Sequence, residues 1–223
     1  MKTLFALFCL GILSLSSILA NSSTWEQWRG PNRNGIIEDQ SFEWPTNLET
    51  IEKVWNKSLG EGYSSPIITE NFVFTVETKD KTYEIARAFD RKTGKQLWEK
   101  SWEGSMKVPF FARKNGSWIR STPVYDKGTL YVCGIRDVLV AIDGQTGKEK
   151  WRVDFVKTEK STVPTFGFVS SPVVLDNYLY VQAGAQVVKI DCSNGKKVWG
   201  SMKDDRATVS YTHLRAHETV RNL

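Results

Sequence analysis

The side chains best suited to chemistry in this chain are three aspartates, Asp126, Asp137 and Asp176, and two histidines, His213 and His217. Carboxylates joined by amide oxygens form calcium sites, and a carboxylate beside a bound cofactor can act as a base. The histidines are four residues apart, a spacing that places both on one face of a helix and suits a metal ion. Taken alone, these residues would indicate a metal-dependent enzyme.

The surrounding sequence favours plainer roles for all five residues. Each aspartate falls where one expected strand reverses into the next, and a solvated Asp is common there because it bonds nearby amides. Both histidines lie in a C-terminal segment without the pattern of the preceding chain, which has no other histidine. Ser-His-Asp or Cys-His catalysis would therefore have no base in the main part of the protein. We predict no catalytic residue and no metal ligand.

A second set of residues is better suited to binding. Tyr63, Arg120 and Phe168 stand just before three Ser-Ser-Pro or Ser-Thr-Pro sequences. Arg120 could meet an anionic ligand, and the two rings offer flat contact area; packing between neighbouring units is the alternative. Residues 101–117 form the longest insert, rich in aromatic and basic residues, and could form either a recognition surface or a lid.

The elements that must position these residues come from an internal repeat. The pattern Asp-x-x-x-Gly-Lys-x-x-Trp occurs at residues 90–98, 143–151 and 191–199, with Trp-to-Trp separations of 53 and 48 residues. A Ser-Pro or Thr-Pro marker precedes each copy. The repeated residues are Asp90, Gly94, Trp98, Asp143, Gly147, Trp151, Asp191, Gly195 and Trp199.

Each repeat predicts four short strands. Apolar runs rich in β-branched and aromatic residues alternate with turn residues, and no helical period is present. The repeated Asp and Gly suit a tight turn, and the repeated Trp can wedge one small sheet against the next. We therefore predict an all-β fold, a β-propeller of four-stranded blades with about three blades present.

These units resemble the pyrroloquinoline-quinone (PQQ) repeat. The run from Ala to Trp is similar to the tryptophan-docking motif of quinoprotein dehydrogenases and related propellers, although the third copy has Lys189 where the others have Ala. Residues 25–35 and 62–66 resemble a secreted bacterial branch, described as PQQ-like and related to the outer-membrane assembly propeller lipoprotein. The resemblance covers about residues 24–204 and implies a closed ring of about seven or eight blades.

The resemblance and the repeat together suggest a division of the chain. We expect a signal peptide at 1–20, an N-terminal segment at 21–60 with a lone outer strand at Val54 and Trp55, and three blades of an incomplete ring at 61–204. The tail at 205–223 lacks the repeat and resembles translated adapter or vector sequence. We therefore expect that the natural gene continues differently after Asp205.

The N-terminus predicts export. A positive residue, Lys2, precedes an apolar run at residues 4–13, which is too short to span a bilayer, and the small residue Ala20 suits cleavage. We expect a secreted or periplasmic protein with no transmembrane segment in the mature chain. Of the cysteines that would remain, Cys133 and Cys192, we predict that neither pairs.

The formal net charge of +5 does not indicate nucleic-acid binding, because cations and anions are interspersed along the chain. Our first hypothesis is an exported, non-catalytic propeller that binds a protein or a small ligand in the cell envelope and needs no cofactor. The alternative is a fragment of a PQQ- and calcium-dependent alcohol or sugar dehydrogenase.

Overall fold

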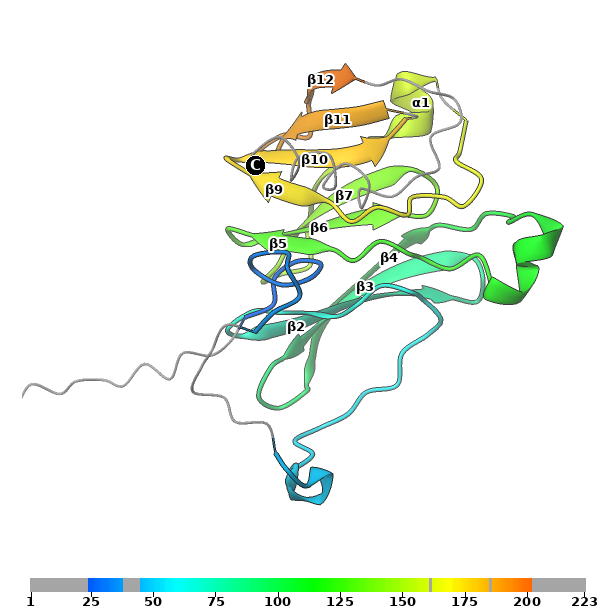
Figure 1. The fold of residues 1–223 in the computed structure, drawn as a ribbon. Coiled ribbons are helices and arrows are strands. Elements are labelled where there is room, and N and C mark those ends of the chain that lie inside the picture. Colours follow the sequence, from blue (N-terminus) through cyan, green and yellow to red (C-terminus); the bar gives the residue numbers. More distant parts are fainter. Residues whose placement is uncertain (1–23, 38–44, 161, 185, 202–223) are drawn as a thin grey trace, which may run out of the picture.

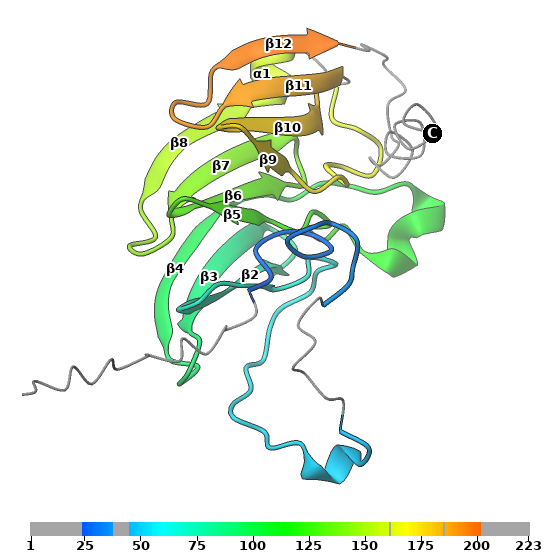
Figure 2. The same ribbon diagram turned by 60° about the vertical axis from the view of Figure 1, so that its left-hand side comes forward.

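The computed structural model describes residues 24–37, 45–160, 162–184 and 186–201, and within them three antiparallel sheets stack side by side (Figures 1 and 2). Each sheet has four strands that neighbour one another in chain order. The first holds β1 (Ile67–Ile68), β2 (Phe72–Lys79), β3 (Tyr83–Asp90) and β4 (Gln96–Glu103). The second holds β5 (Val124–Asp126), β6 (Thr129–Gly134), β7 (Val138–Asp143) and β8 (Glu149–Asp154), and the third holds β9 (Val173–Leu175), β10 (Tyr178–Ala183), β11 (Gln186–Asp191) and β12 (Lys197–Ser201). The predicted all-β fold with four-stranded blades is confirmed.

Burial along the strands follows from the stacking. Every residue of β6 is buried, because the second blade is covered on both sides. In β10 buried residues alternate with half-buried ones, and every residue of β12 is exposed. Strand side chains point alternately to the two faces of a sheet, so a strand covered on one face alternates in burial.

The two apolar cores lie between neighbouring blades. Phe74 of the first blade packs 5.2 Å from Tyr125 of the second and 5.8 Å from Trp98, measured between ring centroids. The second core joins the second and third blades around Phe155, Phe168 and the buried residues of β10 and β11. The repeated sheets therefore hold together by burying apolar side chains between blades.

The last pair of strands in each blade has the same irregularity. The register shifts between Ala88 and Phe89, between Ala141 and Ile142, and between Lys189 and Ile190. Each shift comes one residue before the repeated Asp. A bulge of this kind bends the strand and turns the following residues out of the ladder.

The blades expose two opposite rims, which lie to the left and the right of Figure 1. We call the rim with the turns at 69–71, 91–95, 127–128, 144–148, 176–177 and 192–196 the turn face. We call the rim with the turns at 80–82 and 135–137 and the segments at 104–123 and 155–172 the loop face. The loop face carries η2 (Phe110–Asn115) and α1 (Phe155–Glu159).

The N-terminal residues differ from the expectation. Residues 51–60 form no strand, so Val54 and Trp55 do not make the lone outer strand, although Trp55 contacts the first blade as described below. Trp25 instead forms an antiparallel bridge with Ile68 of β1. A short 3-10 helix, η1 (Leu48–Thr50), precedes residues 51–60. The predicted signal peptide and the tail after 205 lie outside the described residues.

Cys133 in β6 and Cys192 in a turn are both free, as predicted. No helix in the described part of the chain is long and apolar enough to cross a membrane.

Candidate functional site

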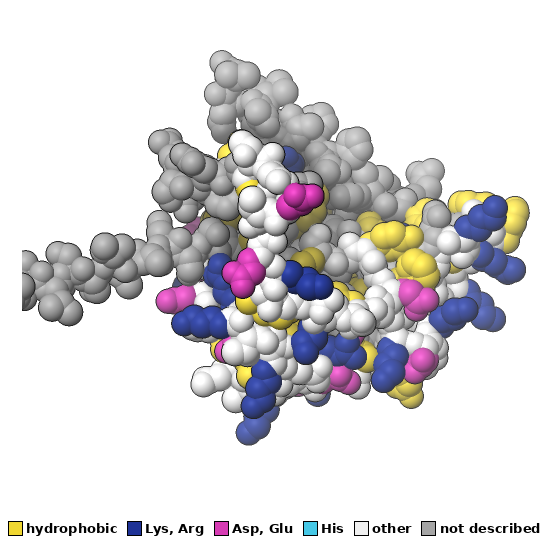
Figure 3. Space-filling view, turned by 90° about the horizontal axis from the view of Figure 1, so that it is seen from below, with side chains coloured by type: hydrophobic (Ala, Val, Ile, Leu, Met, Phe, Trp, Pro, Cys, Tyr) yellow, Lys and Arg dark blue, Asp and Glu magenta, His cyan; other side chains and the backbone are white. Residues whose placement is uncertain are grey.

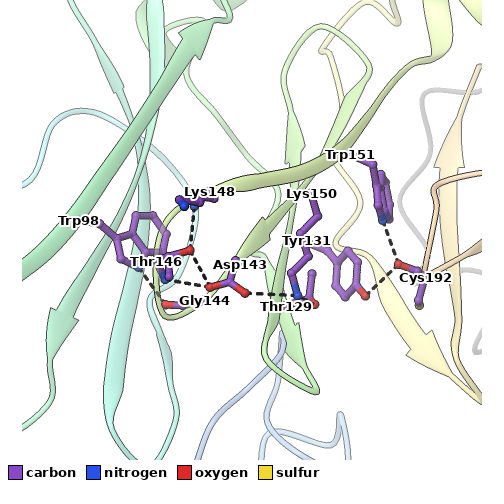
Figure 4. Close-up of polar contacts among 10 residues, drawn as sticks. All are labelled: Trp98, Thr129, Tyr131, Asp143, Gly144, Thr146, Lys148, Lys150, Trp151 and Cys192. Carbon is purple, nitrogen blue, oxygen red and sulfur yellow. Dashed lines mark hydrogen bonds and ion pairs between the residues drawn. The ribbon is translucent and has the colours of Figure 1, made fainter.

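The repeated Asp builds the turns of the turn face (Figure 4). Asp143 Oδ1 accepts hydrogen bonds from the Thr146 amide at 2.9 Å and its hydroxyl at 2.8 Å. These bonds lower the pKa of the Asp143 carboxyl. Asp90 accepts the same two bonds from Thr93, and Asp191 accepts an amide and a hydroxyl bond from Ser193, two residues on instead of three, so the three carboxylates are used in folding the turns.

The repeated Gly and Trp join each blade to the next. Gly147 has φ +72°, and a Cβ built on it would lie 2.7 Å from the Trp98 ring, so only glycine fits beneath that ring. The Trp98 indole N–H donates to the Gly144 carbonyl of the next blade at 2.9 Å. Trp151 repeats this arrangement against Gly195 and the Cys192 carbonyl.

Trp55 docks in the same way although it lies outside any strand. Its indole N–H donates to the Arg91 carbonyl at 2.9 Å, and its ring covers Gly94. Trp199, at the other end of the series, is 41% exposed.

The Ser-Pro and Thr-Pro markers link the blades along their inner edge. The Ser65 amide donates to the Thr122 hydroxyl at 3.1 Å, and the Thr122 amide donates to the Ser171 hydroxyl at 3.0 Å. The markers therefore repeat for a structural reason, because each one donates a hydrogen bond to a marker of a neighbouring blade or accepts one from it.

Two buried carboxylates connect the blades beneath the loop face. Glu84 of β3 accepts from the Ile135 amide of the second blade and from the Trp102 indole, both at 2.6 Å. Burial raises the Glu84 pKa to about 7, against the opposing effect of these two bonds. Asp137 accepts from the Gly184 amide of the third blade at 2.6 Å, and burial raises its pKa to about 6.

The position of Asp137 corrects one expectation. We expected a solvated turn residue, but its side chain is 0% exposed because the third blade covers the turn between β6 and β7. Asp126 and Asp176 lie on the turn face instead. The three aspartates considered for a calcium site are therefore not brought together.

Of the three predicted binding residues, the structure brings two together. The Arg120 guanidinium lies over the Tyr63 ring, 5.0 Å from its centroid, and Tyr63 also contacts Trp118 at 5.7 Å. Arg120 donates to the Gly116 carbonyl, and its Nε has no hydrogen-bond partner among the described residues. Tyr63 is 48% exposed, so the pair can be reached from solvent.

Phe168 lies apart from that pair. Its side chain is 1% exposed within the core between the second and third blades, and its amide donates to the Ile135 carbonyl. Phe168 therefore packs between neighbouring blades, which was the alternative to a role in ligand binding.

A pocket of about 840 Å³ opens on the loop face between the first two blades. Its walls come from the turn at 80–82, the insert after β4, the turn between β6 and β7, and residues 163–165. The lining residues are Lys81, Ser105, Met106, Lys107, Val108, Pro109, Ser117, Arg136, Val163, Pro164 and Thr165. The lining therefore combines cations, hydroxyls and apolar groups, without a carboxylate.

The sequence of residues 81–219 matches a PQQ-like repeat family described as outer membrane protein assembly factor BamB. The chain belongs to this family. A comparison with curated proteins finds no match. The family match runs past residue 205 into the part outside the described residues, so the predicted boundary at 205 stays a prediction.

Solved structures similar to this PQQ-like propeller include BamB from Moraxella catarrhalis, with 18% identity and a TM-score of 0.46 over 68% of this chain. A quinohemoprotein alcohol dehydrogenase from Comamonas testosteroni shows 19% identity and a TM-score of 0.48 over 65% of this chain. A europium-containing methanol dehydrogenase shows 17% identity and a TM-score of 0.45 over 65%. This chain spans 41%, 21% and 25% of those chains, respectively.

Among the described residues of this PQQ-like propeller, no three His, Cys, Asp or Glu side chains lie close enough to hold a metal ion. Two of the buried carboxylates, Glu84 and Asp137, bond the backbone of a neighbouring blade, and a third, Glu77, forms an ion pair with Arg87.

The pocket residues Lys81, Lys107 and Arg136 were missed by sequence reasoning. Lys81 and Arg136 are both the middle residue of the three-residue turn between the second and third strands of a blade. Aligning the repeats by their strands would have paired these two cations. Lys107 lies in the insert, which has no counterpart in the other repeats and so gives no periodic signal.

Proposed function

We propose that this chain is part of an exported, non-catalytic propeller that binds a protein or a small ligand in the cell envelope through its loop face. The observation that carries this proposal is the pocket of about 840 Å³ on that face. Concave sites with a few polar groups among apolar walls are the usual form of a ligand site.

The distribution of used and unused polar groups supports the choice of face. On the turn face the repeated Asp side chains bond their own turns, and the Trp indoles bond the next blade. On the loop face the Tyr63 ring is 48% exposed, and the pocket cations Lys81, Lys107 and Arg136 form no ion pair within the described residues. Exposed cations that the fold does not pair are available to a partner.

The predicted signal peptide at residues 1–20 supports export, and the interspersed charges give no support to a nucleic-acid partner. Cleavage after Ala20 can be tested by N-terminal sequencing of the mature protein from the envelope fraction. A mature chain that retains Met1 in the cytoplasm would contradict this part of the proposal.

A photo-crosslinking amino acid tests the binding face. It is placed at Ser105 on the pocket wall or, as a matched control, at the exposed Lys148 on the turn face. We expect adducts in envelope preparations from the Ser105 variant and none from the Lys148 variant. Equal labelling from both positions, or none from Ser105, would contradict the proposed face.

Addition of PQQ and calcium tests the non-catalytic part of the proposal. We expect the purified chain to retain no quinone absorbance and to oxidise neither alcohols nor sugars. Cofactor-dependent turnover would replace this proposal with the quinoprotein dehydrogenase alternative.

A further inference from the structure

The pocket on the loop face has the charge of an anion site. Three of its lining side chains, Lys81, Lys107 and Arg136, are cations, and all three are exposed. None of them forms an ion pair within the described residues. Hydroxyls from Ser105, Ser117 and Thr165 also line the pocket. Cations with hydroxyl groups beside them are the side chains that bind phosphate oxygens.

The wall that carries Arg136 is fixed by the backbone on its inner side. The amide of Ile135, the preceding residue, donates to the buried Glu84 carboxylate at 2.6 Å. Its carbonyl accepts from the Phe168 amide at 3.1 Å, and Gly167 packs so closely against this carbonyl oxygen that a Cβ there would not fit. Because both polar groups of Ile135 are held, the turn that presents Arg136 is ordered before any ligand binds.

The rim of the pocket is apolar. Phe110 and Phe111 of η2 directly follow the lining residue Pro109, and they are 79% and 69% exposed. Phe111 contacts Phe166, which follows the lining residue Thr165, with ring centroids 6.4 Å apart. The aromatic rim therefore borders the pocket on two of its walls.

Cations flank this rim as well. Arg113 and Lys114 stand in the last turn of η2, and the described chain has no acidic residue between Glu103 and Asp126. Figure 3 shows hydrophobic side chains beside Lys and Arg side chains at the end of the molecule where Figure 1 places η2. Exposed Phe beside Lys and Arg is the combination that inserts into the head-group region of an anionic membrane.

We propose that the pocket binds the phosphate head group of an anionic phospholipid, with Phe110 and Phe111 packing against the lipid chains. This inference rests on the proposed function, because it names the ligand of the same face. The pocket volume of about 840 Å³ exceeds what a lone phosphate ion fills, and the exposed aromatic pair would have no contact with a small polar anion. An amphiphile matches both the cations that line the pocket and its apolar rim.

Vesicle binding by the full chain tests the proposal. Phosphatidylcholine vesicles with added phosphatidylglycerol are compared with phosphatidylcholine alone, and the dissociation constant is measured by co-sedimentation. We expect binding only when phosphatidylglycerol is present. The Lys107→Gln, Arg136→Gln double variant should bind about thirtyfold more weakly, since each cation near an anionic surface contributes about fivefold.

A matched control separates the pocket from general charge. Lys95→Gln, Lys148→Gln removes the same charge from exposed positions on the turn face, and we expect a change within about threefold. If the control weakens binding as much as the pocket variant does, the proposal is overturned, because attraction by overall charge would explain both results.

Two further measurements, a double phenylalanine variant and a competition with glycerol phosphate, distinguish a lipid from free phosphate. Phe110→Ser, Phe111→Ser should weaken vesicle binding at least tenfold, because two exposed rings lose their contact with the acyl region. Glycerol phosphate, the head group without chains, should compete only weakly. Tight binding of glycerol phosphate without vesicle binding, or no binding of either probe, would overturn the proposal. Crosslinks from Ser105 would then still support the binding face, so the two proposals can fail separately.

Discussion

The turn face and the loop face are built from the same strands, yet the fold uses them differently. On the turn face the residues that repeat in the sequence are the residues that hold the blades together, as Gly147 beneath Trp98 shows. On the loop face no motif of this kind recurs, although Lys81 and Arg136 hold equivalent turn positions, and the buried Glu84 and Asp137 contribute the blade contacts beneath it. Periodicity marks the scaffold, and departures from it mark the surface left for binding.

The largest effect should come from the turn face. Trp98→Ala removes a ring that is 9% exposed, together with its bond to the Gly144 carbonyl. We expect the free energy of unfolding to fall by about 3–5 kcal/mol, measured by urea denaturation. A loss below about 1 kcal/mol would contradict the docking role of the repeated Trp.

The second effect is a pH dependence of stability, and it comes from Glu84, which is buried beneath the loop face. The Glu84 pKa is about 7 in the folded chain and 4.5 ordinarily, so between these values the folded chain binds more protons than the unfolded chain. Stability is then fully present below about pH 4.5 and falls as pH rises towards 7, by about 3 kcal/mol at about 1.4 kcal/mol per pH unit. Asp137 lowers stability in the same direction as pH rises from 3.8 to about 6, because burial raises its pKa between these values.

Urea denaturation at about pH 5 and about pH 8 measures this loss. Glu84→Gln cannot ionise, so it should remove the part of the pH dependence above pH 6, where Asp137 contributes little. A free energy of unfolding that is equal at the two pH values would contradict the raised pKa of the buried Glu84 carboxyl.

The third effect compares two copies of one motif. Trp199 has the same place in its repeat as Trp98, but it is 41% exposed. We expect Trp199→Ala to lower the free energy of unfolding by at most about 1 kcal/mol, because little buried area is lost. Equal losses for Trp98→Ala and Trp199→Ala would indicate that Trp199 is covered in solution, for example by a second copy of the chain.

The repeat predicts the scaffold well, because a residue with one structural task must recur wherever the task recurs. The turn at Asp143, the positive φ of Gly147 and the four strands per blade all follow from the pattern. Trp55 shows the limit of this reasoning. Its docking is retained without the strand that we expected around it, since the ring contact needs only the correct position of one side chain.

The contacts beneath the loop face could not be predicted, because they join residues far apart in the sequence. Glu84 bonds an amide 51 residues away, and Asp137 bonds one 47 residues away. Asp137 lies in a turn where an exposed aspartate is common, and it is buried only because the third blade covers that turn. The pocket likewise depends on the path of the insert after β4, which no periodic signal determines.

The smallest effect on stability should come from the pocket. Lys107 and Arg136 are exposed and form no ion pair within the described residues, so Lys107→Gln, Arg136→Gln removes no contact that holds the blades. We expect the free energy of unfolding to stay within about 0.5 kcal/mol of the parent chain in urea denaturation, or to rise slightly as repulsion between the cations is relieved. A loss of more than about 1 kcal/mol would mean that these cations have a structural partner, and the division of labour between the two faces would not hold. Because the same double variant should weaken vesicle binding about thirtyfold, unchanged stability with lost binding is the combination that a surface reserved for a ligand requires.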